Sequence, residues 1–158
     1  MDAPQNGTTI SHTNPALTRT GAETVHDTTV SLVFDIGGKK YTKTAITDGV
    51  TPTTDANSGA TFDALANLYS CIFVWGINAA GTIVVAKGPA VLTADVTNAS
   101  AALKFPPIPD TMCPFAYHTV AHANATAFQF GTSNWNATGV TLGTVIPVGQ
   151  LPNRPLTS

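Results

Sequence analysis

Charge is the property that this sequence has least of. Only 10% of the 158 residues are Asp, Glu, Lys or Arg, against about 25% in an ordinary soluble domain. The formal charge is −2, and the only local group of cations is Lys39, Lys40 and Lys43. Because nucleic-acid binding depends on neutralising phosphates, this composition disfavours a nucleic acid as partner. A surface with so few charges costs little free energy to desolvate, so it suits a protein held against other proteins.

Long hydrophobic runs and abundant cysteine are also missing. The longest apolar run is residues 71–77, which has strand length and is far shorter than the roughly 18 residues of a membrane span. We therefore expect no membrane partner. Cys71 and Cys113 are the only cysteines, and both have apolar neighbours. This predicts two buried thiols, although two cysteines also leave a disulfide open.

The sequence shows no catalytic constellation. Ser70, His118 and Asp110 have the residue types of a nucleophilic triad, but Ser70 lacks the glycines of a nucleophile elbow. The nine acidic residues are scattered, mostly in polar or turn-like segments. We therefore expect no catalytic residue and no cofactor, and we do not interpret the chain as an enzyme.

Cys113, His118 and His122 form a string that resembles a set of metal ligands. In an extended strand the two histidines share a face but lie about 13 Å apart, at roughly 3.3 Å per residue. Cys113 is an odd number of residues from His118, so in a continuous strand it faces the other side. Since zinc ligands lie about 2.0–2.3 Å from the metal, we expect no metal site. The histidines are instead expected at a strand surface or a subunit contact.

What the sequence does contain is a series of short segments with strand periodicity. In residues 30–36 the even positions are all apolar, which is typical of a half-buried strand. The Gly37-Gly38 pair that follows permits a tight two-residue hairpin turn. This turn places Phe34 opposite Tyr41 as a core pair.

The later segments extend this pattern. Residues 68–77 are apolar on both faces, which predicts a central strand covered on each side or closed by a neighbouring subunit. Residues 78–81 fit a type I turn. The remaining expectations are strands at 82–86, 115–122, 126–130 and 140–146, an extended proline-rich segment at 105–109, and a stretch at 90–104 that is ambiguous between short helix and loop.

These segments total seven or eight short strands, and no long helical period competes with them. We therefore expect an all-β fold, as an antiparallel β-sandwich or barrel-like domain. Residues 1–25 lack sustained periodicity, so we expect an extended N-terminal arm followed by a single β domain at 26–158.

Four side chains are candidates for contacts with another molecule. Ile10 and Leu17 are apolar residues of the expected arm, where they are available to dock on another chain. Trp75 lies within an apolar strand and is expected to pack in a core or an interface. Trp135 lies in a polar loop, where an exposed indole would serve as a contact residue.

Five short segments are more informative together than alone. They are residues 36–43 (IGGKKYTK), 51–56 (TPTTDA), 77–83 (INAAGTI), 105–115 (FPPIPDTMCPF) and 151–155 (LPNRP). In this order they resemble segments of small structural proteins from tailed-bacteriophage virions. The resemblance spans about residues 30–155 and carries no catalytic residue over.

The resemblance implies a virion structural protein that decorates and stabilises the exterior of a phage capsid through protein–protein contacts. The implied partner is the major capsid protein or another virion protein, and the implied location is the virion, assembled in the host cytoplasm. A homo-oligomer is expected, with a trimer among the options. The alternative is a tail or fibre component that acts as a carbohydrate-binding module, with Trp135 as its anchor.

Overall fold

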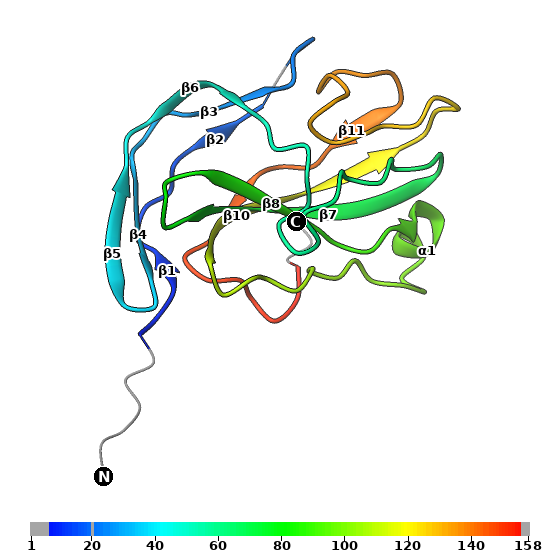
Figure 1. Ribbon diagram of the computed structural model, residues 1–158. Helices are drawn as coiled ribbons and strands as arrows, with labels where there is room; N and C mark the ends of the chain where they lie inside the picture. Colours follow the sequence, from blue (N-terminus) through cyan, green and yellow to red (C-terminus); the bar gives the residue numbers. More distant parts are fainter. Residues whose placement is uncertain (1–6, 20, 156–158) are drawn as a thin grey trace.

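Antiparallel strands dominate the computed structural model of the chain (Figure 1). The model describes residues 7–19 and 21–155. Strands and isolated bridges account for 41% of the described residues and helix for 3%, which confirms the all-β fold. The one helix among the described residues, α1 (Thr93–Thr97), has no buried residue and lies in the stretch that the sequence left ambiguous.

A central sheet is built on two long neighbouring strands, β7 (Tyr69–Asn78) and β10 (Met112–His122). β8 pairs with the outer side of β7, and β11 pairs with the outer side of β10. The remaining members are short: β9 pairs with β7, and β12 pairs with β10. The bounds of these four strands are Ile83–Lys87 (β8), Val91–Leu92 (β9), Val140–Leu142 (β11) and Ile146–Pro147 (β12).

β7 is buried along nearly its whole length, which confirms the prediction of a central strand covered on both faces. The turn that joins it to β8 is also as expected. The Gly81 N–H donates to the carbonyl oxygen of Asn78 over 2.9 Å. The Asn78 side chain accepts further hydrogen bonds from the N–H groups of Ala80 and Thr82, each over 3.0 Å. An asparagine at the first turn position thus closes the turn on itself.

β10 contains a bulge that changes which side chains share a face. Its register with β7 shifts between Pro114 and Ala116, so Phe115 has no partner residue on β7. Pro114 has no N–H to give to the ladder, and bulges are where sheets accommodate such residues. The extra residue reverses the alternation, so Cys113 and His118 face the same cluster of the core. The expectation that they face opposite sides was wrong because it assumed a continuous strand.

Two smaller three-stranded sheets form a second layer over one face of the central sheet (Figure 1). The first has the order β1-β4-β5, and the second has the order β2-β3-β6. The chain passes from β1 to β2, from β3 to β4 and from β5 to β6, so the sheets are two halves of one bent meander. Their strands are Ile10–Ser11 (β1), Leu17–Thr18 (β2), Val25–Thr28 (β3), Leu32–Ile36 (β4), Lys39–Lys43 (β5) and Ile46–Val50 (β6).

Two threonine hydroxyls hold the meander together at its bend. Thr13 Oγ1 donates to the Ser31 carbonyl oxygen and accepts from the Val33 N–H, each over 3.0 Å. Thr28 Oγ1 accepts from the Ile46 N–H over 2.9 Å. These side chains satisfy backbone groups whose ladder partners the bend removes. The abundance of threonine therefore has a structural use here.

The β4–β5 hairpin has the register expected from its glycine turn. Phe34 pairs with Tyr41, and their rings stack with centroids 5.5 Å apart. Gly37 and Gly38 have φ of 58° and 80°, a conformation that glycine adopts without strain. Local turn chemistry thus determines this register.

The structure corrects the expected N-terminal arm at residues 1–25. Residues 10–11 pair with β4 and residues 17–18 pair with β3, so this segment lies against the β domain. Backbone pairing draws on N–H and C=O groups that any sequence supplies, and two-residue strands are too short to show periodicity. Residues 1–6 and 20 of the expected arm lie outside the described residues.

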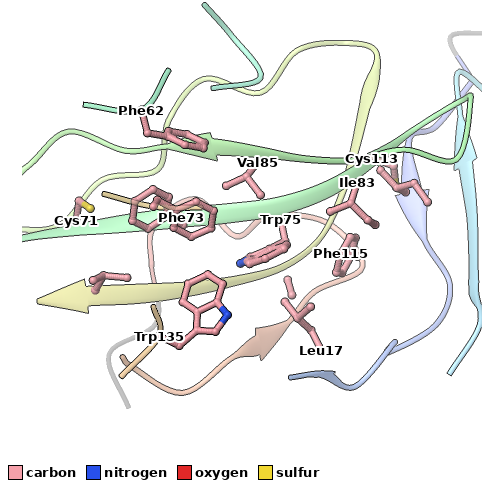
Figure 2. Packing of buried hydrophobic residues seen from close by; sticks show 14 of the residues in the cluster. Leu17, Phe62, Cys71, Phe73, Trp75, Ile83, Val85, Cys113, Phe115 and Trp135 are labelled. Carbon is pink, nitrogen blue, oxygen red and sulfur yellow. The ribbon is translucent and has the colours of Figure 1, made fainter. Parts of the chain in front are cut away.

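The central sheet separates two apolar clusters. The larger lies between this sheet and the bent meander, and Figure 2 shows Phe73 and Trp75 projecting from β7 into it beside Trp135 and Leu17. The smaller cluster is covered by irregular chain rather than by a sheet: the proline-rich segment and the C-terminal segment pack on it. Phe105 meets Tyr117 edge to face there, with ring centroids 4.8 Å apart.

Two predicted strands differ in the structure. Residues 126–130 form only a single bridge, between Phe128 and Leu65, although their alternating side chains still enter the core. The last strand is divided into β11 and β12, both paired with β10. Between them the Gly143 N–H bonds to the Thr119 carbonyl oxygen over 2.8 Å, so the chain stays beside β10 without forming a continuous ladder.

Candidate functional site

Three of the four candidate contact residues are buried in the chain's own core. Trp75 is 0% exposed, Trp135 is 2% and Leu17 is 5%. This burial fits the core alternative for Trp75 and corrects the expected exposure of Trp135 and Leu17. Ile10 stays partly exposed in β1. In this conformation Ile10 alone among the four is available to another molecule.

Trp135 is buried because its polar loop folds over the core. Its indole Nε1–H donates to the Val25 carbonyl oxygen over 2.6 Å, and its backbone N–H donates to the Glu23 carbonyl oxygen over 3.1 Å. Its ring lies against Phe130 and Trp75. Of the polar neighbours that suggested exposure, Ser133 accepts through Oγ from the Gln129 N–H over 3.0 Å, so it satisfies a backbone group of the loop that covers the indole.

His118 and His122 are also buried, not at a strand surface as expected. β10 is covered on both faces, so neither face of that strand is open. His118 Nδ1 accepts a hydrogen bond from the Trp75 Nε1–H over 3.0 Å. Burial, together with the charge of Arg19, holds the pKa of His118 well below its usual value.

A second buried histidine, His26, also contacts Trp75. The His26 ring lies 5.1 Å from the Trp75 ring between centroids, and its Nδ1 is 3.5 Å from Thr51 Oγ1. Burial lowers the pKa of His26, and the charge of Asp27 acts in the opposite direction. Both histidines are therefore expected to be neutral near pH 7 and to act as packing groups.

The other buried reactive groups are equally enclosed. Cys71 and Cys113 are free thiols, and burial raises the pKa of each to about 12. They remain protonated and poorly nucleophilic at neutral pH. Arg19 donates from Nη2 to the Gly143 carbonyl oxygen over 2.7 Å, and burial lowers its pKa to about 10.

Within residues 7–19 and 21–155, no group of three or more His, Cys, Asp and Glu side chains is placed to hold a metal ion. The same residues contain no helix that is long and apolar enough to cross a membrane.

A groove of about 800 Å³ lies on the surface of the described residues, and we call it the hairpin groove. The tip of the β4–β5 hairpin, the proline-rich segment and the C-terminal segment form its walls. Its apolar side chains include Ile36, Ile108 and Leu151, and among the described residues of its lining Asp110 alone is charged. The groove thus offers a partner apolar side chains and backbone groups with little charge.

Close backbone packing fixes the walls of the hairpin groove. A Cβ on Gly7 would overlap the backbone of Gly37, so only glycine allows this approach. The Gly38 N–H donates to the Thr8 carbonyl oxygen over 3.1 Å. The Ser11 N–H donates to the Gly149 carbonyl oxygen over 2.9 Å, which holds β1 beside the C-terminal wall. Ile10 therefore lies at the margin of this groove.

Three of the five short segments that the sequence analysis groups together lie at the hairpin groove. Segments 36–43, 105–115 and 151–155 supply three of its walls. The turn within 77–83 lies next to the first of these, since a Cβ on Gly81 would be 3.5 Å from Lys43 Cδ. Segment 51–56 does not line this groove. Near its end, Asp55 forms an isolated bridge with Val85 of β8.

Ile36, Ile108 and Leu151 line the hairpin groove but were not among the four predicted contact residues. Those four are large apolar side chains, and the fold buries three of them in its own core. The available signal was the resemblance, because each of these residues lies in one of its segments.

Comparison with known proteins adds no family to this picture. No protein-family model, no curated protein and no solved structure matches this chain.

Proposed function

We propose that this protein is a structural component of a phage virion that decorates and stabilises the exterior of the capsid. The observation that carries the proposal is the convergence of three resembling segments on the hairpin groove. These segments are separated in sequence by tens of residues, so only the fold brings them together. We explain the proximity of the three segments by a common role in contacting a partner protein.

The chemistry of the groove supports contact with protein. Ile36, Ile108 and Leu151 are partly exposed, and burying such apolar area stabilises a complex by roughly 25 cal/mol per Å² before association costs are counted. The partner is an apolar segment of the major capsid protein, or of another virion protein. Weak contacts of this kind suffice in a shell, because many copies act together.

The low charge of the chain supports the same role. Only 10% of its residues are charged, so few ions need to be desolvated when the surface is covered. Lys39 and Lys40 are exposed beside the groove, at the hairpin tip. They favour a partner surface with acidic side chains around an apolar centre. A homo-oligomer on the shell, with a trimer among the options, remains part of the proposal.

The proposal can be tested on purified particles of the virus whose genome encodes this chain. We expect mass spectrometry to find the protein, and electron cryomicroscopy to place its density on the outer shell with the hairpin groove against the capsid. Absence from the particle would overturn the proposal. Density confined to the tail or fibre would overturn the capsid placement.

Two variants separate the groove from the rest of the surface. The double variant Ile108→Ser and Leu151→Ser removes apolar groups from the groove. Because both residues also pack on the smaller cluster, circular dichroism first checks that the variant is folded. We expect the occupancy of the folded variant on stripped particles to fall about tenfold or more relative to the wild type. Val50→Ser is the control, because Val50 is 84% exposed and lies outside the groove. If the double variant, Val50→Ser and the wild type all occupy the particles equally, the capsid contact does not run through the hairpin groove.

A further inference from the structure

A second groove, with no lining residue in common with the first, borders β8 and the start of β7. Its volume is about 460 Å³, within the roughly 300–1,000 Å³ typical of small-ligand sites. We call it the Tyr69 groove. Its charged and phenolic lining residues are Asp55, Asp63, Tyr69 and Lys87, and the rest of the lining is Ser58, Thr61, Phe62 and small residues.

Three of these four charged and phenolic side chains remain available to a ligand. Within the described residues, the Asp63 carboxylate and the Tyr69 hydroxyl have no hydrogen-bond partner. Lys87 Nζ donates to the Asp63 backbone carbonyl oxygen over 2.7 Å, which fixes the ammonium in place. Because an ammonium carries three donors, two remain for a ligand.

Asp55 has a different role, because its own chain already occupies its carboxylate. Oδ1 accepts from the Lys87 N–H over 3.1 Å, and Oδ2 accepts from the N–H groups of Asn57 and Ser58 over 3.2 and 3.1 Å. The carboxylate thus ties the loop to β8. Asp55 builds the wall of the groove, while Asp63, Lys87 and Tyr69 face the ligand.

The loop that carries Asp63 is held rigidly. The Phe62 side chain is buried and meets Phe73 edge-on, with ring centroids 5.7 Å apart. Both residues are labelled in Figure 2. The Phe62 N–H donates to the Thr53 carbonyl oxygen over 3.0 Å, and Gln129 Nε2 donates to the Phe62 carbonyl oxygen over 3.0 Å. A groove prepared in this way loses little conformational entropy when a ligand binds.

We propose that the Tyr69 groove binds a neutral carbohydrate. A carboxylate can accept from two neighbouring sugar hydroxyls, and the ammonium can donate to a third oxygen. The Tyr69 ring and the alanines and proline of the lining offer an apolar surface to the C–H face of a pyranose. The two carboxylates disfavour an anionic ligand, and Lys87 disfavours a cationic one.

This inference goes beyond the proposed capsid contact and does not depend on it. Trp135, the expected sugar anchor, is buried and cannot take that role in this conformation. The structure instead assigns carbohydrate recognition to a different part of the chain, built on Tyr69. A shell protein with such a site would attach particles to glycans on a surface.

The test uses the full chain and methyl glycosides of glucose, galactose, mannose and N-acetylglucosamine as probes. We expect saturation-transfer NMR to detect at least one of them, with a dissociation constant in the millimolar range. Amide chemical shifts should move at Asp63, Tyr69 and Lys87. No binding by any of the four glycosides, or shifts confined to other regions, would overturn the proposal.

Point variants test the assigned groups. Asp63→Asn keeps the shape of an exposed side chain but removes its charge, and we expect affinity to fall about tenfold. Asp110→Asn is the matched control, because Asp110 is also exposed but lines the hairpin groove. Equal loss in both variants, or no loss in Asp63→Asn, would contradict the assignment. Inorganic phosphate that binds better than every glycoside would contradict the choice of a neutral ligand.

Discussion

The indole Nε1–H of Trp75 donates to Nδ1 of His118 over 3.0 Å, and neither side chain is exposed to solvent. The donor requires a lone pair on Nδ1, so the imidazole is neutral and carries its proton on Nε2. That Nε2 has no hydrogen-bond partner within the described residues. Protonation of Nδ1 would break the bond to Trp75 and leave a charge in the core, which explains why the structure disfavours the charged form.

The first prediction is that stability falls in mild acid. Burial lowers the pKa of His118 and of His26 in the folded state, so the unfolded chain binds more protons once the pH drops below about 6.5. The stabilisation is complete above that pH and decreases toward the folded-state pKa values. We expect the free energy of unfolding to fall by up to about 1.4 kcal/mol per pH unit for each histidine. Urea unfolding between pH 7.5 and 5 measures this slope.

A variant without the titrating group provides the control for that slope. His118→Phe should reduce the slope by about half, because His26 is then the only one of the two histidines whose pKa is lowered in the folded state. A wild-type slope near zero across this range would contradict the neutral, enclosed state of both histidines.

The second prediction concerns the donor itself. Trp75→Phe removes the indole N–H and part of the buried volume, and we expect a loss of roughly 2–4 kcal/mol in the free energy of unfolding. It also frees His118 Nδ1, so the pH slope should become shallower. Trp135→Phe is the matched control, since it loses a hydrogen bond to Val25 but no contact with His118 Nδ1. It should destabilise the fold and leave the slope unchanged.

The parts of the fold that could be predicted from sequence are those set by neighbouring residues. The Gly37-Gly38 turn determines the β4–β5 register, and Asn78 closes the turn before β8, because each acts on chain a few residues away. The residues of β7 are apolar at both odd and even positions, and this pattern by itself indicates that both faces of the strand are covered.

The remaining features depend on which distant segments meet. Pro114 causes a bulge only because β10 pairs along its whole length with β7, and that bulge reverses the facing of Cys113. Trp135 is buried because its loop bonds to residues 23 and 25, more than a hundred positions away. The hairpin groove likewise joins three separated segments. Periodicity cannot report such pairings, because it describes one segment at a time.

The third prediction tests whether the N-terminal segment belongs to the domain. Leu17 is 5% exposed and packs in the larger cluster, so Leu17→Ala should cost about 2–4 kcal/mol of stability. Val50→Ala is the comparison, because an 84% exposed side chain should change stability by less than about 0.5 kcal/mol. Chemical denaturation of both variants decides the question. Equal stability would restore the interpretation of residues 7–19 as an arm outside the core.

The last prediction concerns the bend of the meander. Thr13→Val keeps the shape of the side chain but removes the hydroxyl that bonds to both Ser31 and Val33. Two half-buried backbone groups then lose their partner, and we expect the free energy of unfolding to fall by about 1–3 kcal/mol. Thr42→Val makes the same change on an exposed position of β5, where a β-branched apolar residue should be neutral within about 0.5 kcal/mol. If both variants unfold at the same denaturant concentration as the wild type, the Thr13 hydroxyl does not hold the bend.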